Sequence, residues 1–407
     1  MSDSEPEFLY RQPRMDDVEN VEAYKPGGYH PIDIGDKIGT GNQQYQVVHK
    51  LGYGGFSTVW LVHPLGETSS YFALKVLRAD VVHVNELEVL QHLKAAAGPG
   101  HPNVVVLHDP FKVSGPNGEH HCLVFPVLGP SLYRTAVLKA LPSPVRHRIC
   151  EQLSSALAFL HSHGICHGDL TPSNVVFELP AARLDQFLTP INAENLKLGN
   201  GSRSRHAPMQ VIQAPEFLGF DYSSLWKVRI IDFGEAFFTS LPPSSLGSPI
   251  EFFPPELCFG YSPSAKADIW QLACVFYMVH SGRFLFPVFF EIYEILIGTI
   301  VNCVGPLPQH WRGRFKFESF GYRERGREQN KTDPEWWFDD KAPKNSVDSQ
   351  LTEHAPHLST HQREHYVRLL CKMLDLEPNA RLSAADVGSI LGQHPEDVVE
   401  LKTKGDE

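Results

Sequence analysis

The stretch that decides the interpretation of this sequence is His167-Gly168-Asp169-Leu170-Thr171-Pro172-Ser173-Asn174. It follows a helical run and leads into the apolar residues 175–177, which predicts a loop between a helix and a strand. A second carboxylate, Asp232, opens Asp-Phe-Gly after the apolar residues 228–231. Asp169, Asn174 and Asp232 are the base, amide and carboxylate that metal-assisted phosphoryl transfer needs at strand ends. A plain turn rich in Asp and Asn has the same composition, so the interpretation depends on the surrounding motifs.

Length and composition indicate a globular chain with two lobes. The 407 residues are enough for two sizeable cores, and 42% hydrophobic with 20% charged residues is typical of a folded protein. The net charge of −11 argues against direct nucleic-acid binding and is compatible with a cationic substrate. The seven Cys residues include no C-x-x-C pair, which favours a reducing compartment and argues against a zinc site.

No segment predicts export or membrane insertion. Residues 1–8 are acidic and have no apolar core, unlike a signal peptide. The most apolar stretch, residues 284–301, is interrupted by Pro287, Glu291 and Glu294, so we expect a buried helix there and no contact with a membrane. We expect a cytoplasmic monomer, and the sequence leaves nuclear entry open.

A glycine-rich hairpin is predicted near the N-terminus. Residues 45–51 and 58–62 are strand-like, and the turn between them lacks the Cβ atoms that would keep a triphosphate away from the backbone. The residues expected to cover the phosphates are Leu51, Gly52, Tyr53, Gly54, Gly55, Phe56, Ser57, Thr58 and Val59. Turns attract glycine in any case, so the hairpin alone is a weak signal.

A lysine lies inside the next predicted strand, residues 71–77. Lys75 needs a partner in this apolar run, and Glu86 on the following helical segment can provide one. Such a pair would hold the α- and β-phosphates of a nucleotide, with Ala73 nearby. The alternative is a lysine at a sheet edge whose stem covers apolar surface.

Residues 121–128 predict a strand that runs into a turn. This segment can offer backbone groups to an adenine, with Phe125 behind the base and Val127 and Leu128 beside it. A plain core strand has the same pattern. Further along, Asp268 opens a helix that is apolar nearly all round, and Arg381 is expected to pair with Glu256.

These motifs follow one another in an order that resembles the eukaryotic protein kinases over residues 45–393. The segments Gly27-Gly28-Tyr29-His30-Pro31 and Leu51 to Trp60, with an insertion after the catalytic loop, are similar to the SR-protein kinase family in a divergent, fungal-type form. The resemblance implies an α+β fold with a small β-rich N-lobe, about 45–125, and a larger helical C-lobe, about 129–393.

The remaining segments complete the expected organisation. Residues 1–20 are expected to be disordered, residues 21–44 to form an N-terminal arm, and residues 394–407 to form a charged tail. Residues 178–224 match the family's spacer insertion and are expected to be mostly loop, and residues 306–360 to be a surface insert.

The resemblance implies an ATP- and Mg²⁺-dependent enzyme that phosphorylates Ser in protein substrates, Arg/Ser-rich splicing factors in this family. Asp169 would act on the substrate hydroxyl, and Lys75, fixed by Glu86, would hold the phosphates. Asn174 and Asp232 would hold the metal ions.

Three departures from the family pattern stand out. Gly168 replaces the usual Arg before the catalytic Asp, so we expect an enzyme active without phosphorylation of its activation segment. Thr171 replaces a Lys that would neutralise the γ-phosphate, and residues 247–253 lack the Arg that the family places near the substrate serine.

Two other functions remain open at this stage. The loop and Asp-Phe-Gly also resemble aminoglycoside and choline phosphotransferases, although the glycine hairpin, Pro-Pro-Glu and Asp-Ile-Trp favour a protein substrate. A scaffold that binds ATP without turning it over is the other alternative, and Thr171 is its motivation.

Overall fold

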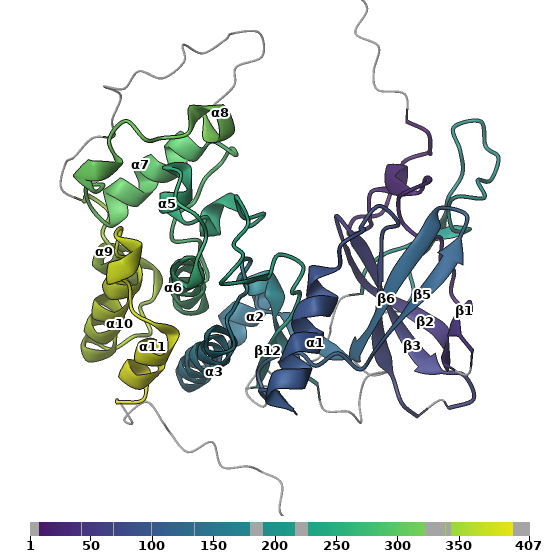
Figure 1. Ribbon diagram of the computed structural model, residues 1–407, viewed down its shortest axis with the longest axis horizontal. Coiled ribbons are helices and arrows are strands. Elements are labelled where there is room, and N and C mark those ends of the chain that lie inside the picture. The colour runs from purple at the N-terminus through teal and green to yellow at the C-terminus, as the bar shows by residue number, and fades with distance from the viewer. Residues whose placement is uncertain are drawn as a thin grey trace, which may run out of the picture. The chain divides into compact units, whose positions relative to one another are not determined.

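The structure is a computed structural model. It describes residues 8–393 except 42, 68, 99, 134, 180–189, 216–226, 322–337 and 339–342 (Figure 1). The chain divides into two compact units. The first comprises residues 1–95, 105–129 and 179–220, and the second comprises residues 96–104, 130–178 and 221–407. The predicted charged tail, residues 394–407, lies outside the described residues.

The first unit is built on a six-stranded antiparallel sheet in the order β1-β2-β3-β4-β6-β5. Its strands are β1 (Lys37–Thr40), β2 (Gln43–Gly54), β3 (Ser57–Pro64), β4 (Phe72–Leu77), β5 (Asp109–Gly115) and β6 (Gly118–Pro126), with helix α1 (Asn85–Ala97) following β4. Trp60, Leu74 and Val124 are buried together on one face, because side chains alternate between the two faces of a strand. These strands confirm three predictions. The glycine-rich hairpin is β2–β3, the strand that contains Lys75 is β4, and the strand predicted at 121–128 is β6.

The N-terminal arm and the insertion pack together in this unit. The short helix η1 (Val21–Ala23) and the hairpin β10 (Ala193–Asn195) and β11 (Gln210–Ile212) belong to it. Its second core contains Tyr10, Val21, Ala23, Tyr24, Tyr29, Leu196 and Val211.

The expectation of a disordered segment over 1–20 is wrong for residues 9–20, since Tyr10 is buried and bridges Leu198. The insertion was expected to be mostly loop, yet its described residues include a hairpin in the first unit. Both segments have scattered apolar residues without periodicity, and these become a core only when distant parts of the chain meet.

The second unit is mainly helical. Its helices are α2 (Thr135–Ala140), α3 (Ser143–Ser162), α5 (Pro255–Cys258), α6 (Ala265–Ser281), α7 (Tyr293–Cys303), α8 (Phe317–Phe320), α9 (Val347–His354), α10 (Thr360–Met373) and α11 (Ala384–Leu391). Its single-turn helices are η2 (Pro172–Asn174), η4 (Ile250–Phe252), η5 (Gln309–Trp311) and η6 (Pro378–Ala380). Small sheets join β12 (Val228–Ile230), β9 (Val175–Glu178) and β7 (Leu128–Ser131), and β13 (Phe237–Phe238) with β8 (Ile165–Cys166).

Helix α6 is the centre of this unit, as its sequence predicts. Every residue from Ala267 to His280 is buried. Ser264 caps its first turn through Lys266 N, and Gly282 ends it in the left-handed conformation. The helix packs against α3, α9 and α10, so the motif residues on its first turns are held on a rigid support (Figure 1).

Two expectations for the second unit need correction. The apolar stretch 284–301 is not one buried helix, because α7 begins at Tyr293 and Phe289 is 92% exposed. Pro287 prevents a helix from continuing through from residue 284, since proline is tolerated only in the first turn of a helix. The predicted surface insert 306–360 contributes buried residues at its described ends, among them Trp311 and Leu351. In the described part of the chain, no helix combines the length and hydropathy that crossing a membrane requires.

Candidate active site

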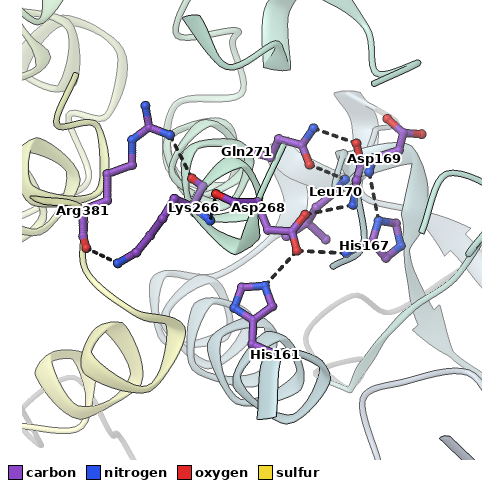
Figure 2. Close-up of polar contacts among 10 residues, drawn as sticks. His161, His167, Asp169, Leu170, Lys266, Asp268, Gln271 and Arg381 are labelled. Carbon is purple, nitrogen blue, oxygen red and sulfur yellow. Dashed lines mark hydrogen bonds and ion pairs between the residues drawn. The ribbon is translucent and has the colours of Figure 1, made fainter. Parts of the chain in front are cut away.

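The backbone of the loop 167–174 is held by two side chains of α6 (Figure 2). Asp268 accepts hydrogen bonds from His167 N and Gly168 N, both at 2.9 Å. Gln271 accepts from Leu170 N at 2.9 Å and donates to Gly168 O at 3.1 Å. Because Asp268 and Gln271 lie about one turn apart on a buried helix, the loop has little freedom to move.

Sequence reasoning missed most of this support. Asp268 was interpreted only as a residue typical of a helix start, and Gln271 was not considered. His161 also contacts the Asp268 carboxylate, with 2.8 Å between Nε2 and Oδ2. Their positions on predicted helices were visible in the sequence, but their loop partners lie some 100 residues away and depend on packing.

Asp169 and Asn174 contact each other directly. Asn174 Nδ2 donates to Asp169 O at 2.9 Å and to Asp169 Oδ2 at 2.8 Å. The other carboxylate oxygen, Asp169 Oδ1, is buried and has no hydrogen-bond partner among the described residues. Burial raises the pKa of Asp169 to about 7, and the carboxylates of Asp232 and Glu235 add to the rise while the Asn174 amide opposes it. A buried acceptor without a donor at a loop end indicates a place for a bound molecule.

Asp232 lies beside this pair. Ile230 pairs with Val175 in the antiparallel β12–β9 ladder, and this pairing brings the end of β12 to the start of β9. Ile231 N donates to Asn174 O at 2.9 Å, which ties the Asp-Phe-Gly segment to the loop. Asp232 has φ of 61°, an uncommon value for a residue other than glycine and one that clusters at functional sites.

In the first unit, the predicted contact between Lys75 and Glu86 is present. Lys75 Nζ lies 2.7 Å from Glu86 Oε2, and the two side chains are 12% and 4% exposed. The Lys75 ammonium group has a buried carboxylate as its partner. The alternative interpretation, a lysine at a sheet edge whose stem covers apolar surface, is therefore not needed. The pair fixes the lysine over the middle of the sheet.

The register places the predicted nucleotide-binding residues on one face of the sheet. Ala73 on β4 pairs with Phe125 on β6, and Lys75 pairs with Val59 on β3. Paired residues share a face, and so do residues two apart, so Val59, Ala73, Lys75 and Phe125 face the same side. Trp60, Leu74 and Val124 occupy the opposite face. Val127 and Leu128 follow directly after β6.

The glycines of the β2–β3 hairpin are not required by the protein itself. A Cβ at Gly52, Gly54 or Gly55 would meet nothing within 4 Å, and none of the three has a positive φ. Neither packing nor conformation explains them, so the open space is available to a ligand that approaches the backbone. Leu51 and Tyr53 are partly exposed and Phe56 is well exposed.

Two residues of the predicted phosphate loop, Ser57 and Thr58, have buried side chains. Thr58 is fully buried, and its hydroxyl accepts a hydrogen bond from Trp60 Nε1 at 3.0 Å. Ser57 is also buried. Their side chains therefore serve the sheet, because β3 begins at Ser57, and only their backbone remains relevant to a nucleotide.

Known proteins resemble the chain in these regions. A family model described as a protein kinase domain matches residues 45–198. The serine/threonine-protein kinase SRPK of Physarum polycephalum is 29% identical over 90% of this chain and 89% of its own length. SRSF protein kinase 3 of Homo sapiens is 35% identical over 40% of this chain and 30% of its own length, so the chain matches under a third of that relative. The crystal structure of a kinase domain covers 89% of this chain and 98% of its own, with a TM-score of 0.60 and 19% identity.

Residues 45–198 match the protein kinase domain, and the fold is that of a kinase domain. The predicted bilobal kinase fold, with a β-rich first unit and a helical second unit, is confirmed. The similarity to the kinase named SRPK extends over most of the chain.

The side chains of the kinase fit the groups that its family uses. Asn174 and Asp232 offer amide and carboxylate oxygens, which are the ligands that Mg²⁺ prefers. A different cluster, His161, Cys166 and Asp268, has ligand atoms within 4.8 Å of one another. It has a structural explanation, since Asp268 accepts the loop N–H groups and burial raises the pKa of the Cys166 thiol, which keeps it protonated.

The activation segment of the kinase, residues 232–256, is anchored at both ends. Arg381 Nη1 and Nη2 donate to the two carboxylate oxygens of Glu256, each at 2.7 Å, which confirms the predicted pair. Nearer Asp-Phe-Gly, Glu235 Oε2 accepts from Gly247 N at 3.1 Å. Phe252 and Phe253 are buried, so the segment is also held by burial of apolar surface.

Thr171, which stands where the family has a lysine, is buried and does not face solvent. It is 3% exposed, and it precedes the short helix η2 that carries Asn174. Its side chain therefore belongs to the packed base of the loop.

Proposed function

We propose that this kinase transfers the γ-phosphate of ATP to serine side chains of Arg/Ser-rich proteins, and that it does so without prior phosphorylation. The observation that carries the proposal is the cluster of Asp169, Asn174 and Asp232 on a loop held by α6. The open backbone of the glycine hairpin and the Lys75–Glu86 pair support the same reaction.

In this mechanism the side chains divide the tasks of binding, metal holding and proton transfer. Lys75, oriented by Glu86, binds the α- and β-phosphates, and the hairpin 51–59 covers them with backbone N–H groups. Asn174 and Asp232 would hold Mg²⁺, which would supply positive charge to the phosphates when bound. Asp169 accepts the proton of the substrate hydroxyl as that oxygen attacks the γ-phosphorus, and the bond from this phosphorus to the β,γ-bridging oxygen breaks to release ADP.

The Asn174 amide also orients the base. Its contact with Asp169 Oδ2 leaves Oδ1 as the oxygen without a partner, so Oδ1 is the atom we assign to the substrate hydroxyl. A base held by a side chain on the same rigid loop needs little reorganisation during the reaction.

The substrate class follows from charge and similarity. A net charge of −11 favours the approach of a cationic peptide, and SRSF protein kinase 3 is named for SR-type substrates. The absence of an Arg in residues 247–253 distinguishes this kinase from the family pattern, so its preference for Arg next to Ser is a separate part of the proposal.

Constitutive activity follows from how the activation segment is held. Gly168 has no side chain to pair with a phosphate, whereas the Glu235–Gly247 contact and the Glu256–Arg381 pair need no modification. The segment is thus ordered by groups that are present in the unmodified chain.

The test is to produce the full chain in bacteria, treat it with phosphatase, and measure ³²P transfer to a peptide array. We expect transfer to Arg/Ser peptides, none by Asp169→Asn, and no stimulation of ATP hydrolysis by small alcohols. Transfer that falls more than about tenfold after phosphatase treatment, a loss of ~1.4 kcal/mol in transition-state stabilisation, would contradict constitutive activity. Nucleotide binding without any transfer would contradict the enzymatic function and favour a scaffold.

A further inference from the structure

A tyrosine of the N-terminal arm contacts the glycine-rich hairpin. The Tyr29 hydroxyl donates to Gly54 O at 2.7 Å, and the Tyr29 side chain is buried. The next two carbonyl groups of the turn also have donors, since Gly55 O accepts from Arg78 Nη1 at 3.2 Å and Phe56 O accepts from Arg78 N at 2.9 Å. Three consecutive carbonyl groups at the tip of the hairpin are therefore bound from one side.

The arm itself is attached to the end of β4. Ala79 N donates to Gly28 O at 3.0 Å and Asp80 N donates to Gly27 O at 2.8 Å. A Cβ at Gly28 would lie 1.7 Å from Ala23 O, so the tight path of the arm requires a glycine at this position. The Arg78 guanidinium lies 5.8 Å from the centre of the Tyr29 ring, which brings the two donors of the hairpin tip together.

The buried side-chain amide of Asn117 joins the arm to the spacer insertion, residues 178–224. Asn117 Nδ2 donates to Tyr29 O at 2.6 Å and to His206 O at 2.7 Å. Asn117 Oδ1 lies 2.6 Å from His206 Nδ1, and Asn117 O accepts from Gly27 N at 2.8 Å. Asn117 is 3% exposed, so its hydrogen bonds are not in competition with water.

A second attachment lies at the base of the hairpin. Lys50, directly before the phosphate loop, forms a buried ion pair with Glu19, which lies just before the N-terminal arm. The Tyr24 hydroxyl donates to the same carboxylate at 2.5 Å. Both charged groups are almost fully buried, so each needs the other as its partner of opposite charge.

We propose that Tyr29 is a positioning residue for the phosphate loop. We propose further that the segment 19–29, which includes the first residues of the arm, is a built-in clamp that fixes the hairpin before a nucleotide binds. This inference rests on the proposed function only in assuming that the hairpin covers ATP. A glycine-rich turn loses more conformational entropy on ordering than any other. A hydrogen bond that orders it in advance reduces the entropy lost on binding, and so increases nucleotide affinity.

The test compares Tyr29→Phe with Tyr10→Phe in the full chain. Both replacements remove a hydroxyl from the same buried cluster, but the Tyr10 hydroxyl contacts Tyr24 O and Ser204 Oγ and not the hairpin. Hydrogen exchange of the amides of residues 52–57, without nucleotide, reports directly on the order of the loop. Activity assays give KM for ATP and kcat separately.

For Tyr29→Phe we expect exchange in the loop to accelerate by about 3- to 10-fold, the value of one hydrogen bond, and KM for ATP to rise by a similar factor. The kcat value should change less than about twofold, because Tyr29 touches the loop and not the reacting atoms. Tyr10→Phe should leave all three quantities unchanged. Equal loop exchange in the two variants would overturn the clamp.

The exchange measurement separates this inference from the proposed function. If the wild-type chain transfers no phosphate but the loop still loosens in Tyr29→Phe, the clamp stands and the proposed activity fails. If transfer proceeds and Tyr29→Phe changes neither loop exchange nor KM for ATP, the activity stands and the clamp fails.

Discussion

Gly168 and Glu235 approach each other so closely that no side chain fits at position 168. A Cβ on Gly168 would lie 2.4 Å from the Glu235 carbonyl oxygen, and Gly168 has φ of 78°. The arginine that many kinases have here is therefore incompatible with this loop and not merely replaced. The same neighbour, Glu235, binds Gly247 N in the activation segment.

Gly168→Ala should destabilise the second unit and impair catalysis. A left-handed conformation costs a residue other than glycine about 1–3 kcal/mol, and the clash with the Glu235 carbonyl adds to this. Gly164→Ala is the control, because Gly164 has φ of 71° but its nearest neighbour would be 3.5 Å away. Urea unfolding and phosphate transfer should show a larger loss for Gly168→Ala. Equal losses for the two variants would mean that the close approach to Glu235 is unimportant.

Asp169→Asn should abolish transfer and leave nucleotide affinity nearly intact. The carboxylate that accepts the substrate proton is lost, a change that costs about 10²–10⁴-fold in rate for a catalytic base. ATP affinity from calorimetry should change less than about twofold. Asp348→Asn, in the first turn of α9, is a control that should affect neither quantity. Retained turnover in Asp169→Asn would remove Asp169 from the role of base.

Glu256→Gln should strongly lower the free energy of unfolding. It leaves the Arg381 guanidinium, whose side chain is 0% exposed, without its carboxylate partner. Removing one partner of a buried ion pair costs about 3–5 kcal/mol. Glu119→Gln is the matched control, since the Lys112–Glu119 pair is also short at 2.6 Å but both side chains are more than half exposed, at 51% and 58%. The midpoint of urea unfolding of Glu119→Gln should match that of the wild type. A wild-type midpoint for Glu256→Gln as well would show that the buried pair contributes little to the free energy of unfolding.

Stability of the first unit should depend on the protonation of His30. Burial, together with the neighbouring His120, lowers the pKa of His30 from 6.5 to about 4. The ring centres of the two histidines are 4.6 Å apart. Below pH 6.5 the unfolded chain binds a proton at His30 that the folded chain does not, so stability is full above pH 6.5 and is lost as the pH falls towards 4.

The predicted loss from His30 is about 2 kcal/mol between pH 7 and pH 5. His30→Gln removes this titration, so the difference in unfolding free energy between wild type and variant should change with pH by that amount. Urea unfolding at pH 7, 6 and 5 measures it. A difference that is constant across this range would show that His30 titrates normally in the folded protein.

The sequence by itself predicted most of the elements and the class of reaction. Strands, hairpin and helices follow from apolar periodicity within a few residues, which is a property of the local chain. The pair Lys75–Glu86 was also predictable, because a charge inside an apolar segment requires a partner of opposite sign. The pair Glu256–Arg381 was expected from the order of the motifs. The spacing of Asp169, Asn174 and Asp232 indicated phosphoryl transfer for the same local reason.

Only the tertiary structure decided how those residues are held. Gln271 and Asp268 bind loop N–H groups about 100 residues earlier in the chain, and Asp268 carried no signal beyond that of a helix start. Tyr29 binds Gly54, and Gly168 excludes a side chain because Glu235 lies against it. The burial of Tyr10 beside the insertion likewise joins scattered apolar residues. Such contacts depend on the relative placement of distant segments, which packing of the complete chain sets and no local pattern encodes.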